Sequence, residues 1–399
     1  MNILRQLYEM TALQGLIDQP GTLIMILIGL ILLYLGIKKE YEPLLLVPIG
    51  FGLILANAIG GGMGVITNDE ISHLPLIEIA KKYGIMNLLY YSLIKTGLLP
   101  PIIFMGVGAL TDFGPMLRNL RLAFFGAAAQ IGIFTVLFGA ILVGFTPQEA
   151  GSLGIIGGAD GPTAIYTTII LAPHLLGPIA VAAYSYMALV PVIIPLVVRF
   201  TMSEKDLLIN MKEQDRLYPS KRPIKNIRVA KIIFPLVIGG IVAIAVPTAV
   251  PLIGMLMFGN LVKEIGMNTE RLHKAASGGI MNTATIFLGL TVGATMTVET
   301  FLNMKTILII AGGFLAFAIS IAGGIFAVKI YNLFNKKKIN PLIGATGLSA
   351  VPMASRVANE ISLKHDPGNH ILQYAMASNI SGVIGSAVAA GVLLSVLAH

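Results

Sequence analysis

Long runs without a single charged residue constrain this chain more than any other feature. The segments 22–37, 122–146 and 307–328 contain no Asp, Glu, Lys or Arg. Each is close to the about 20 residues that an α-helix needs to cross the hydrocarbon core of a bilayer. Because several such runs occur, the chain is predicted to be an all-α polytopic membrane protein, with the lipid bilayer as its surroundings.

The composition excludes an ordinary soluble domain. Charged residues make up 12% and hydrophobic residues 56% of the chain, whereas charged residues reach about 25% in soluble domains. The net charge of +8 is interpreted as positive cytoplasmic loops. No basic tract with interleaved aromatic residues indicates nucleic-acid binding. Residues 1–20 include Glu9 and Asp18, so they are expected to form an amphipathic lead-in on the membrane surface and not a signal peptide.

Several kinds of chemistry are absent from the sequence. There is no cysteine, which excludes disulfides and thiolate metal sites. There is no HExxH or GxSxG motif, and the six histidines are scattered. We therefore expect no transition metal.

One hydrophilic stretch divides the chain. Residues 201–231 hold eight Lys or Arg and four Asp or Glu, which predicts a cytoplasmic loop. We expect a first transmembrane repeat over 21–200 and a second over 232–399.

The two flanking segments resemble each other in the order of their features. Pro48 precedes Asn57 by nine residues, and Pro251 precedes Asn260 by the same interval. A Val-Gly-Ala triplet, a long apolar run, a glycine-rich polar stretch and a final apolar helix with polar interruptions then follow in both halves. Paired broken segments of this kind indicate a transporter-like fold with its site near the membrane midplane. We expect inverted repeats with re-entrant hairpins; the alternative is likeness by composition alone.

Asp160 is the most informative polar residue. It lies in the run Gly157-Gly158-Ala159-Asp160-Gly161-Pro162, where the glycines and the proline prevent a continuous helix. A carboxylate at the centre of a bilayer costs about 2.5–3.5 kcal/mol, so it needs a partner or a function. A carboxylate beside free carbonyl and hydroxyl oxygens suits a hard cation. The alternative is a polar turn outside the membrane.

Other polar side chains lie in the apolar segments. Asn379 and Ser386 are seven residues apart, so they share one face of the last helix, and Ser381 lies between them; such residues also serve as packing contacts between membrane helices. Tyr184 and Tyr186 occupy the corresponding place in the first half, where an interfacial aromatic belt is the alternative. Arg356 is expected to pair with an anion if it lies in the membrane, and otherwise to reach the lipid headgroups.

These motifs resemble a known family. The stretches GGADGPTAIY around Asp160, NPLIGATGLSAVPMASR at 340–356 and SNISGVIGSAVAAGVLL from Ser378 are similar to the beta subunit of the sodium-translocating, biotin-dependent oxaloacetate, methylmalonyl-CoA and glutaconyl-CoA decarboxylases. The segments EPLLLVPIGFGLILAN and 90–117 resemble it too, so the resemblance spans nearly the whole chain. The N-terminal region and the central loop are shorter here than in the longer family members.

The resemblance implies a sodium pump in the inner membrane. A carboxyltransferase alpha subunit with a biotin carrier would deliver carboxybiotin, and this subunit would decarboxylate it, consume a proton and export Na⁺. A small gamma- or delta-type subunit and a homo-oligomer are implied as further partners. The carboxylic substrate is recognised by the alpha subunit in this family.

The resemblance also implies roles for individual residues. Asp160 and Asn379 match sodium ligands, and Tyr186 and Ser349 match the hydroxyls of a second sodium site and a proton pathway. Arg356 matches a position needed for function, and its charge suggests that it holds the carboxylate of carboxybiotin. Supporting positions are Asn340, Gly344, Gly157, Gly158, Gly161, Ser381 and Ser386.

Two other functions fit part of the evidence. A sodium-coupled secondary carrier or a Na⁺/H⁺ antiporter without decarboxylase partners would explain the repeats, the broken helices and Asp160 equally well. A membrane scaffold would leave the charged Asp160 and Arg356 unexplained. Only the family motifs favour the decarboxylase.

Overall fold

The computed structural model describes residues 19–67, 69–219, 226–350 and 352–398. Within these ranges the regular structure is entirely helical, as the sequence predicts. The expected amphipathic lead-in at 1–20 falls almost wholly outside them. Seven helices are long and apolar enough to cross a membrane, or up to nine if each of two bent pairs is counted as one span, within the part of the chain that is described.

The first half contains two bent helix pairs, with a broken segment between them. Its elements are α3 (Pro20–Lys38), α4 (Pro43–Ala56), α5 (Asp69–Ser72), α6 (Leu76–Leu89), the π-helical turn η1 (Tyr90–Ile94), α7 (Leu99–Leu110), α8 (Gly114–Arg118), α9 (Leu120–Ala129), α10 (Ile131–Val143), α11 (Pro147–Gly154), the 3₁₀ turn η2 (Ile155–Gly158), α12 (Gly161–Leu171), η3 (Pro173–Leu175), α13 (Leu176–Ala188) and α14 (Val190–Thr201). Prolines begin α3, α4 and α11, where the missing N–H would have no helical partner.

The second half follows two short helices of the hydrophilic stretch, α15 (Glu204–Leu207) and α16 (Met211–Leu217). Its elements are α17 (Ile227–Ala245), η4 (Pro247–Ala249), α18 (Val250–Ile265), η5 (Met267–Thr269), α19 (Glu270–Lys274), the π-helical turn η6 (Ala275–Ile280), α20 (Met281–Ala294), α21 (Val298–Phe301), α22 (Met304–Phe334), α23 (Leu342–Ala345), α24 (Met353–His365) and α25 (Leu372–Leu397). α17 begins inside the segment assigned to the loop, because the Asn226 side chain caps it by accepting from the Val229 N–H.

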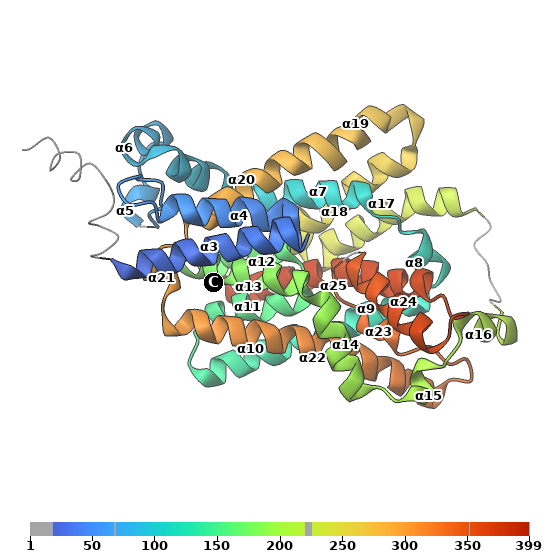
Figure 1. Ribbon diagram of the computed structural model, residues 1–399. Helices are drawn as coiled ribbons and strands as arrows, with labels where there is room; N and C mark the ends of the chain where they lie inside the picture. The colour runs from blue at the N-terminus through green and yellow to red at the C-terminus, as the bar shows by residue number, and fades with distance from the viewer. Residues whose placement is uncertain (1–18, 68, 220–225, 351, 399) are drawn as a thin grey trace, which may run out of the picture.

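The two halves are in contact through two pairs of helices. α4 packs against α20, and α7 packs against α18; Figure 1 shows α4 beside α20 and α7 beside α18 along the upper face. At the contacts a Cβ on Gly108 would lie 1.9 Å from the Leu256 carbonyl oxygen, and one on Gly293 would lie 2.2 Å from the Ile49 carbonyl oxygen. The glycine of each Val-Gly-Ala triplet thus lets two helix backbones touch.

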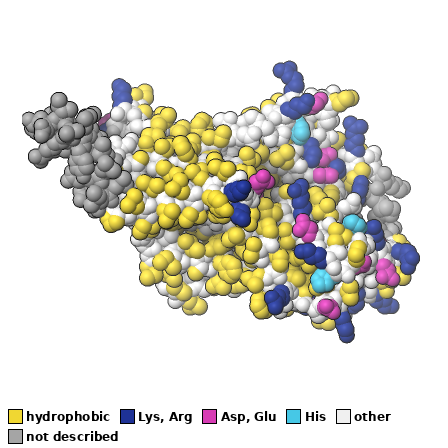
Figure 2. Space-filling view, in the orientation of Figure 1, with side chains coloured by type: hydrophobic (Ala, Val, Ile, Leu, Met, Phe, Trp, Pro, Cys, Tyr) yellow, Lys and Arg dark blue, Asp and Glu magenta, His cyan; other side chains and the backbone are white. Residues whose placement is uncertain are grey.

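The charged side chains of the visible face gather at one end of the molecule. Figure 2 shows Lys, Arg, Asp and Glu mainly over the right-hand end, whereas hydrophobic side chains cover the middle. That end carries α15, α16 and α24. Lys337 pairs there with Asp215 at 2.5 Å and Lys329 with Asp206 at 3.0 Å. That this end is cytoplasmic, as the positive-inside rule indicates, stays a prediction.

The breaks in the helices only partly follow the sequence analysis. The two glycine-rich stretches are interrupted as expected, since η2 ends at Ala159 with φ +55° and α23 lasts only four residues. The apolar run 122–146, expected as one helix, forms one candidate span, Leu120–Val143, in which α9 and α10 meet at a turn at Gln130. Bends of 66° between η1 and α7 and of 70° between α13 and α14 were not predicted.

Candidate functional site

Asp160 lies at the turn between η2 and α12. Ala159 takes a left-handed conformation, and Asp160 is then extended. Its Oδ1 accepts from the Thr163 N–H at 3.3 Å, so the carboxylate caps α12. The carboxylate therefore meets the positive end of a helix dipole, which stabilises negative charge.

Three separate elements converge on this carboxylate. Oδ2 accepts from the Ser386 hydroxyl of α25 at 2.9 Å and from the Ser349 hydroxyl, between α23 and α24, at 3.1 Å. The Ser349 N–H also donates to the Gly158 carbonyl at 3.0 Å. The tips of the two broken segments are thus joined directly, and Asp160 is only 6% exposed. No Lys, Arg or His of the described ranges forms an ion pair with it.

Asn379 lies beside the second broken segment, on the face of α25 that also carries Ser386. Its Nδ2 donates to the Thr346 carbonyl at 3.1 Å and to the Leu348 carbonyl. Its Oδ1 is buried and has no hydrogen-bond partner among the described residues. The oxygen of this amide, which lies next to Leu348, is thus available as a neutral ligand close to Ser349.

The two tyrosines have different neighbours. The Tyr186 hydroxyl donates to the Ile310 carbonyl of α22, and its ring packs against Phe314 and Phe317. It is therefore not hydrogen-bonded to Asp160. Tyr184 lies closer to the turn, because a Cβ on Gly161 would come 2.0 Å from its ring. Its buried hydroxyl has no hydrogen-bond partner within the described ranges.

Among the supporting positions, Asn340 and Gly344 hold the second broken segment in place. The Asn340 Nδ2 donates at 3.1 Å to the carbonyls of Leu207 and Ile209, which fastens the segment to the hydrophilic loop. Gly344 packs on Gly324 of α22 with almost no space between the backbones. Neither touches Asp160, so their contribution is to position the segment.

The remaining predicted residues lie around the site or outside it. Gly157 and Gly158 line the first tip, where Ser320 and Ser386 approach them. The Ser381 hydroxyl donates to the Ala123 carbonyl of α9. Arg356 is exposed on α24, and none of the ion pairs among the described residues involves it.

Gln130 is a buried polar residue of this region that the sequence analysis did not single out. It lies between α9 and α10, and its Nε2 donates to the carbonyls of Gly126 at 3.0 Å and Gly347 at 3.4 Å. The available signal was a lone amide inside the apolar run 122–146. No local motif accompanies it.

The chemistry of the site suits a small monovalent cation. It offers one carboxylate, two hydroxyls and amide oxygens, which are hard ligands. The described residues contain no group of three or more His, Cys, Asp or Glu side chains that could hold a metal ion. A single carboxylate balances one positive charge.

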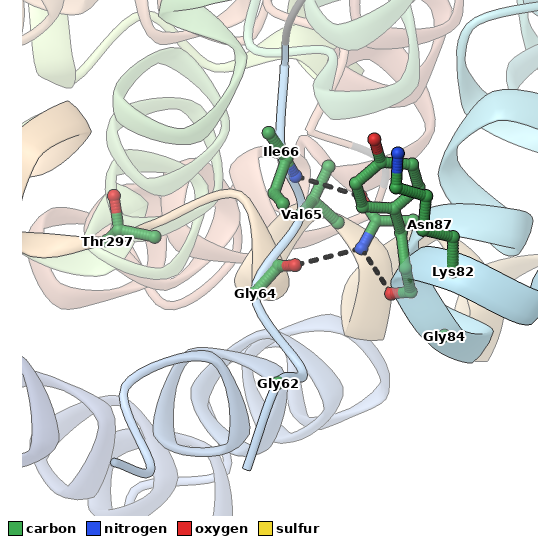
Figure 3. Close-up of a pocket in the computed structure, with 9 residues that line it drawn as sticks. Gly62, Gly64, Val65, Ile66, Lys82, Gly84, Asn87 and Thr297 are labelled. Carbon is green, nitrogen blue, oxygen red and sulfur yellow. Dashed lines mark hydrogen bonds between the residues drawn. The ribbon is translucent and has the colours of Figure 1, made fainter. Parts of the chain in front are cut away.

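A separate cavity of about 460 Å³ lies between the loop after α4 and the helix α6. Figure 3 shows the Asn87 amide bridging this loop, where it donates to the Gly64 carbonyl at 3.0 Å and accepts from the Ile66 N–H at 2.9 Å. Lys82 lies at its rim, and no carboxylate lines it. Among the described residues, the cavity therefore has no carboxylate that would balance the charge of a cation.

Comparison with known proteins gives a consistent result. The model of the family described as Na⁺-transporting oxaloacetate decarboxylase beta subunit matches residues 21–397. The methylmalonyl-CoA decarboxylase subunit beta of Propionigenium modestum is 49% identical over 397 residues, 97% of each chain. The glutaconyl-CoA decarboxylase subunit beta of Acidaminococcus fermentans is 46% identical, over 94% of this chain and 93% of its own. The oxaloacetate decarboxylase beta chain 2 of Salmonella typhi is 44% identical over 94% of each chain.

Proposed function

The chain belongs to the family of Na⁺-transporting oxaloacetate decarboxylase beta subunits, and from this premise we propose that it decarboxylates carboxybiotin and uses that reaction to export Na⁺. It is a multi-pass membrane subunit of a sodium-transporting decarboxylase. In the proposed reaction the bond between the biotin nitrogen and the carboxyl carbon breaks. CO₂ leaves, and a proton takes its place on the nitrogen.

The observation that carries this proposal is the buried Asp160 without a cationic partner. Two hydroxyls and one backbone N–H contact the carboxylate, yet hydrogen bonds alone leave its charge uncompensated in a low-dielectric surrounding. Bound Na⁺ neutralises it. Asp160 and Asn379 are the proposed ligands, and Ser349 and Tyr186 are the proposed hydroxyls of a second site and of the proton pathway.

Coupling follows from competition at the same oxygens. A proton on Asp160 removes the charge that attracts Na⁺, so a proton arriving from one side displaces the ion. Neutralising the carboxylate by either cation also makes movement of the site relative to lipid less costly. Two repeats that rock against each other around a fixed site would provide alternating access.

The partner subunits and the biotin carrier are proposed from the family. A carboxyltransferase alpha subunit would bring carboxybiotin to the cytoplasmic end, where the exposed Arg356 is available to pair with its carboxylate. Relatives named for three different acids are similar to this chain over nearly its whole length, which supports substrate recognition by the alpha subunit. A small gamma- or delta-type subunit, a homo-oligomer and an inner-membrane location complete the proposal.

The decisive experiment measures carboxybiotin decarboxylation and tracer sodium uptake by the purified complex in liposomes, with and without Na⁺. We expect turnover that depends on Na⁺ and is accompanied by its accumulation. Asp160→Asn should abolish both while the protein still inserts, and Asp366→Asn, the same change at a half-buried loop residue, should retain both. Sodium-dependent turnover in Asp160→Asn would remove this carboxylate from the mechanism. Sodium movement without decarboxylation would indicate a secondary transporter.

A further inference from the structure

Three successive carbonyl groups at the tip of the second broken segment each accept an N–H from a side-chain amide. Thr346 and Leu348 accept from the Nδ2 of Asn379. Gly347, between them, lies 3.4 Å from the Nε2 of Gln130. The amide nitrogens of two residues from different helices are thus bound to one short strip of backbone.

This arrangement fixes where the two amide oxygens point. Because each nitrogen is held by carbonyl oxygens, each amide oxygen must face away from the strip. Both oxygens, Oε1 of Gln130 and Oδ1 of Asn379, are buried and have no hydrogen-bond partner in the part of the chain that the structure describes. An unpaired buried acceptor costs about 1–3 kcal/mol, so two of them beside one carboxylate require an explanation.

The surroundings of Gln130 place its oxygen at the joint between the two tips. A Cβ on Gly158 would lie 3.5 Å from Oε1 and 2.8 Å from the Cβ of Ser386. A Cβ on Gly385 would lie 3.2–3.3 Å from the Gln130 side chain. The amide therefore lies between the first tip and α25, next to Ser386, which donates to Asp160. Only 6% of the surface of Gln130 is exposed.

We propose that Gln130 supplies a neutral oxygen ligand to the transported cation at the junction of the two broken segments. The inference rests on the proposed function, in which Na⁺ is the cargo. A cation satisfies an amide oxygen that has no donor, and carbonyl-type oxygens are common ligands of hard cations. Together with Asp160 and Asn379, Gln130 brings the junction of α9 and α10, the start of α12 and α25 into one coordination sphere, so the cation holds these elements together.

The test compares two substitutions that separate the oxygen from the nitrogen. Gln130→Met removes both and keeps the length of the side chain, whereas Gln130→Glu keeps an oxygen and loses both N–H donors. Two readouts are used: the Na⁺ concentration for half-maximal turnover in liposomes, and the rise in thermal unfolding temperature that Na⁺ causes in the detergent-solubilised full chain. We expect Gln130→Met to raise the half-maximal concentration at least about tenfold, the scale of loss when groups around a metal site are removed.

The Glu variant decides between binding and packing. We expect Gln130→Glu to retain the thermal response to Na⁺ and to change the preference for Na⁺ over Li⁺, because a charged oxygen replaces a neutral one. Equal losses in both variants would show that only the hydrogen bonds from Nε2 to Gly126 and Gly347 matter, and an unchanged Met variant would also overturn the inference. If Gln130→Met does not insert, an unchanged ion preference in Gln130→Glu overturns it.

A matched control keeps the result specific. Asn260 is also a fully buried amide with an unpaired oxygen and a nitrogen bound to carbonyls, but it lies between α18 and α7. Asn260→Ala should leave the Na⁺ dependence unchanged, whatever its effect on yield. A wild-type protein that shows no response to Na⁺ in either readout would instead refute the proposed function, and the inference with it.

Discussion

The side-chain amide of Asn57 donates to the Met296 carbonyl at 2.7 Å, across the contact between α4 and α20. A similar bond runs in the opposite direction, from the Asn260 amide of the second half to the Thr111 carbonyl of the first half at 2.8 Å, across the contact between α18 and α7. Met296 and Thr111 each lie four residues after the valine of a Val-Gly-Ala triplet. The two bonds therefore support our proposal that the chain is built from two related repeats. In each repeat, one asparagine donates to a backbone carbonyl at the end of a helix of the other repeat.

Replacing either asparagine should destabilise the protein. Asn57→Leu or Asn260→Leu leaves buried carbonyl groups without donors, which predicts a loss of about 1–3 kcal/mol in the free energy of unfolding. Unfolding in detergent measures the effect. Asn335→Ala is the control, because its amide bonds only to Tyr331 at the end of its own helix. Similar losses in all three variants would contradict a special role for these two asparagines.

The hydroxyls on Asp160 should tune its competition between Na⁺ and protons. Ser386→Ala and Ser349→Ala each remove a donor to Oδ2, and hydrogen bonds to charged groups contribute about 1.5–3 kcal/mol. The protonated carboxyl is then favoured, so the half-maximal Na⁺ concentration should rise about tenfold or more at neutral pH. Sodium titration of turnover at two pH values tests this.

Two comparisons complete the serine experiment. Ser362→Ala removes a buried hydroxyl that donates to the Asn369 carbonyl, away from Asp160, and should not shift the titration. Because Ser386 and Ser349 donate to one oxygen, the double variant should show less than the sum of the single effects. Strict additivity would mean that the two hydroxyls act independently.

Gly344→Ala should disrupt the second broken segment. Its Cβ would lie 2.0 Å from the Gly324 carbonyl oxygen and 2.5 Å from the carbonyl carbon, so two backbones must separate, at a cost of about 1–3 kcal/mol or more. Gly240→Ala on α17 meets nothing within 4 Å and should be neutral or stabilising by up to about 1 kcal/mol. Folded yield and thermal unfolding compare the two, and equal behaviour would contradict the packing argument.

Glu149 should make the stability of the folded protein depend on pH in the acid range. Burial alone would raise the pKa of this carboxyl, but hydrogen bonds from Lys305, His174 and the Thr146 N–H outweigh it and lower the pKa from 4.5 to about 2. A lowered pKa in the folded state stabilises the protein above the unfolded value, and this contribution is lost as the pH falls from about 4.5 to about 2. Lys305 and His174 are more than half exposed, so solvent screening reduces the effect.

The measurement for Glu149 is thermal unfolding as a function of pH. We expect the wild type to lose more stability than Glu149→Gln between pH 4.5 and 2, and the two curves to converge at the acid end. Lys274 and Glu270 form an exposed ion pair, and Glu270→Gln serves as the control with little effect. Parallel curves for wild type and Glu149→Gln would contradict the role of this network.

Tyr186→Phe tests whether the second hydroxyl site exists as the family resemblance implies. The hydroxyl donates to the Ile310 carbonyl, so a purely structural role predicts lower stability with an unchanged pH profile of turnover. A role in the proton pathway predicts a lower rate and a shifted pH profile. Tyr331→Phe, an aromatic residue that packs on Phe125, provides the comparison.

The sequence predicted those features that leave a local pattern. Charge-free runs indicated the membrane helices, and glycines with a proline beside Asp160 indicated the break that holds it. Ser349 and Ser386 were named before their contacts with Asp160 were visible. The bends after η1 and at Leu189 were not predicted although local signals accompany them: Gly97 has a positive φ before the first bend, and prolines lie at the start of α7 and of α14. Gln130 escaped prediction because nothing in its neighbourhood along the chain shows that Gly347, 217 residues away, accepts its N–H.

The bond from the Ser349 N–H to the Gly158 carbonyl uses main-chain atoms on both sides. Apart from proline at 349, no replacement of a side chain deletes either partner. The alignment of the two tips therefore does not depend on which side chains they carry. Hydroxyl and amide side chains around the carboxylate can be replaced to alter which ion is preferred, while the backbone of the two tips keeps its position.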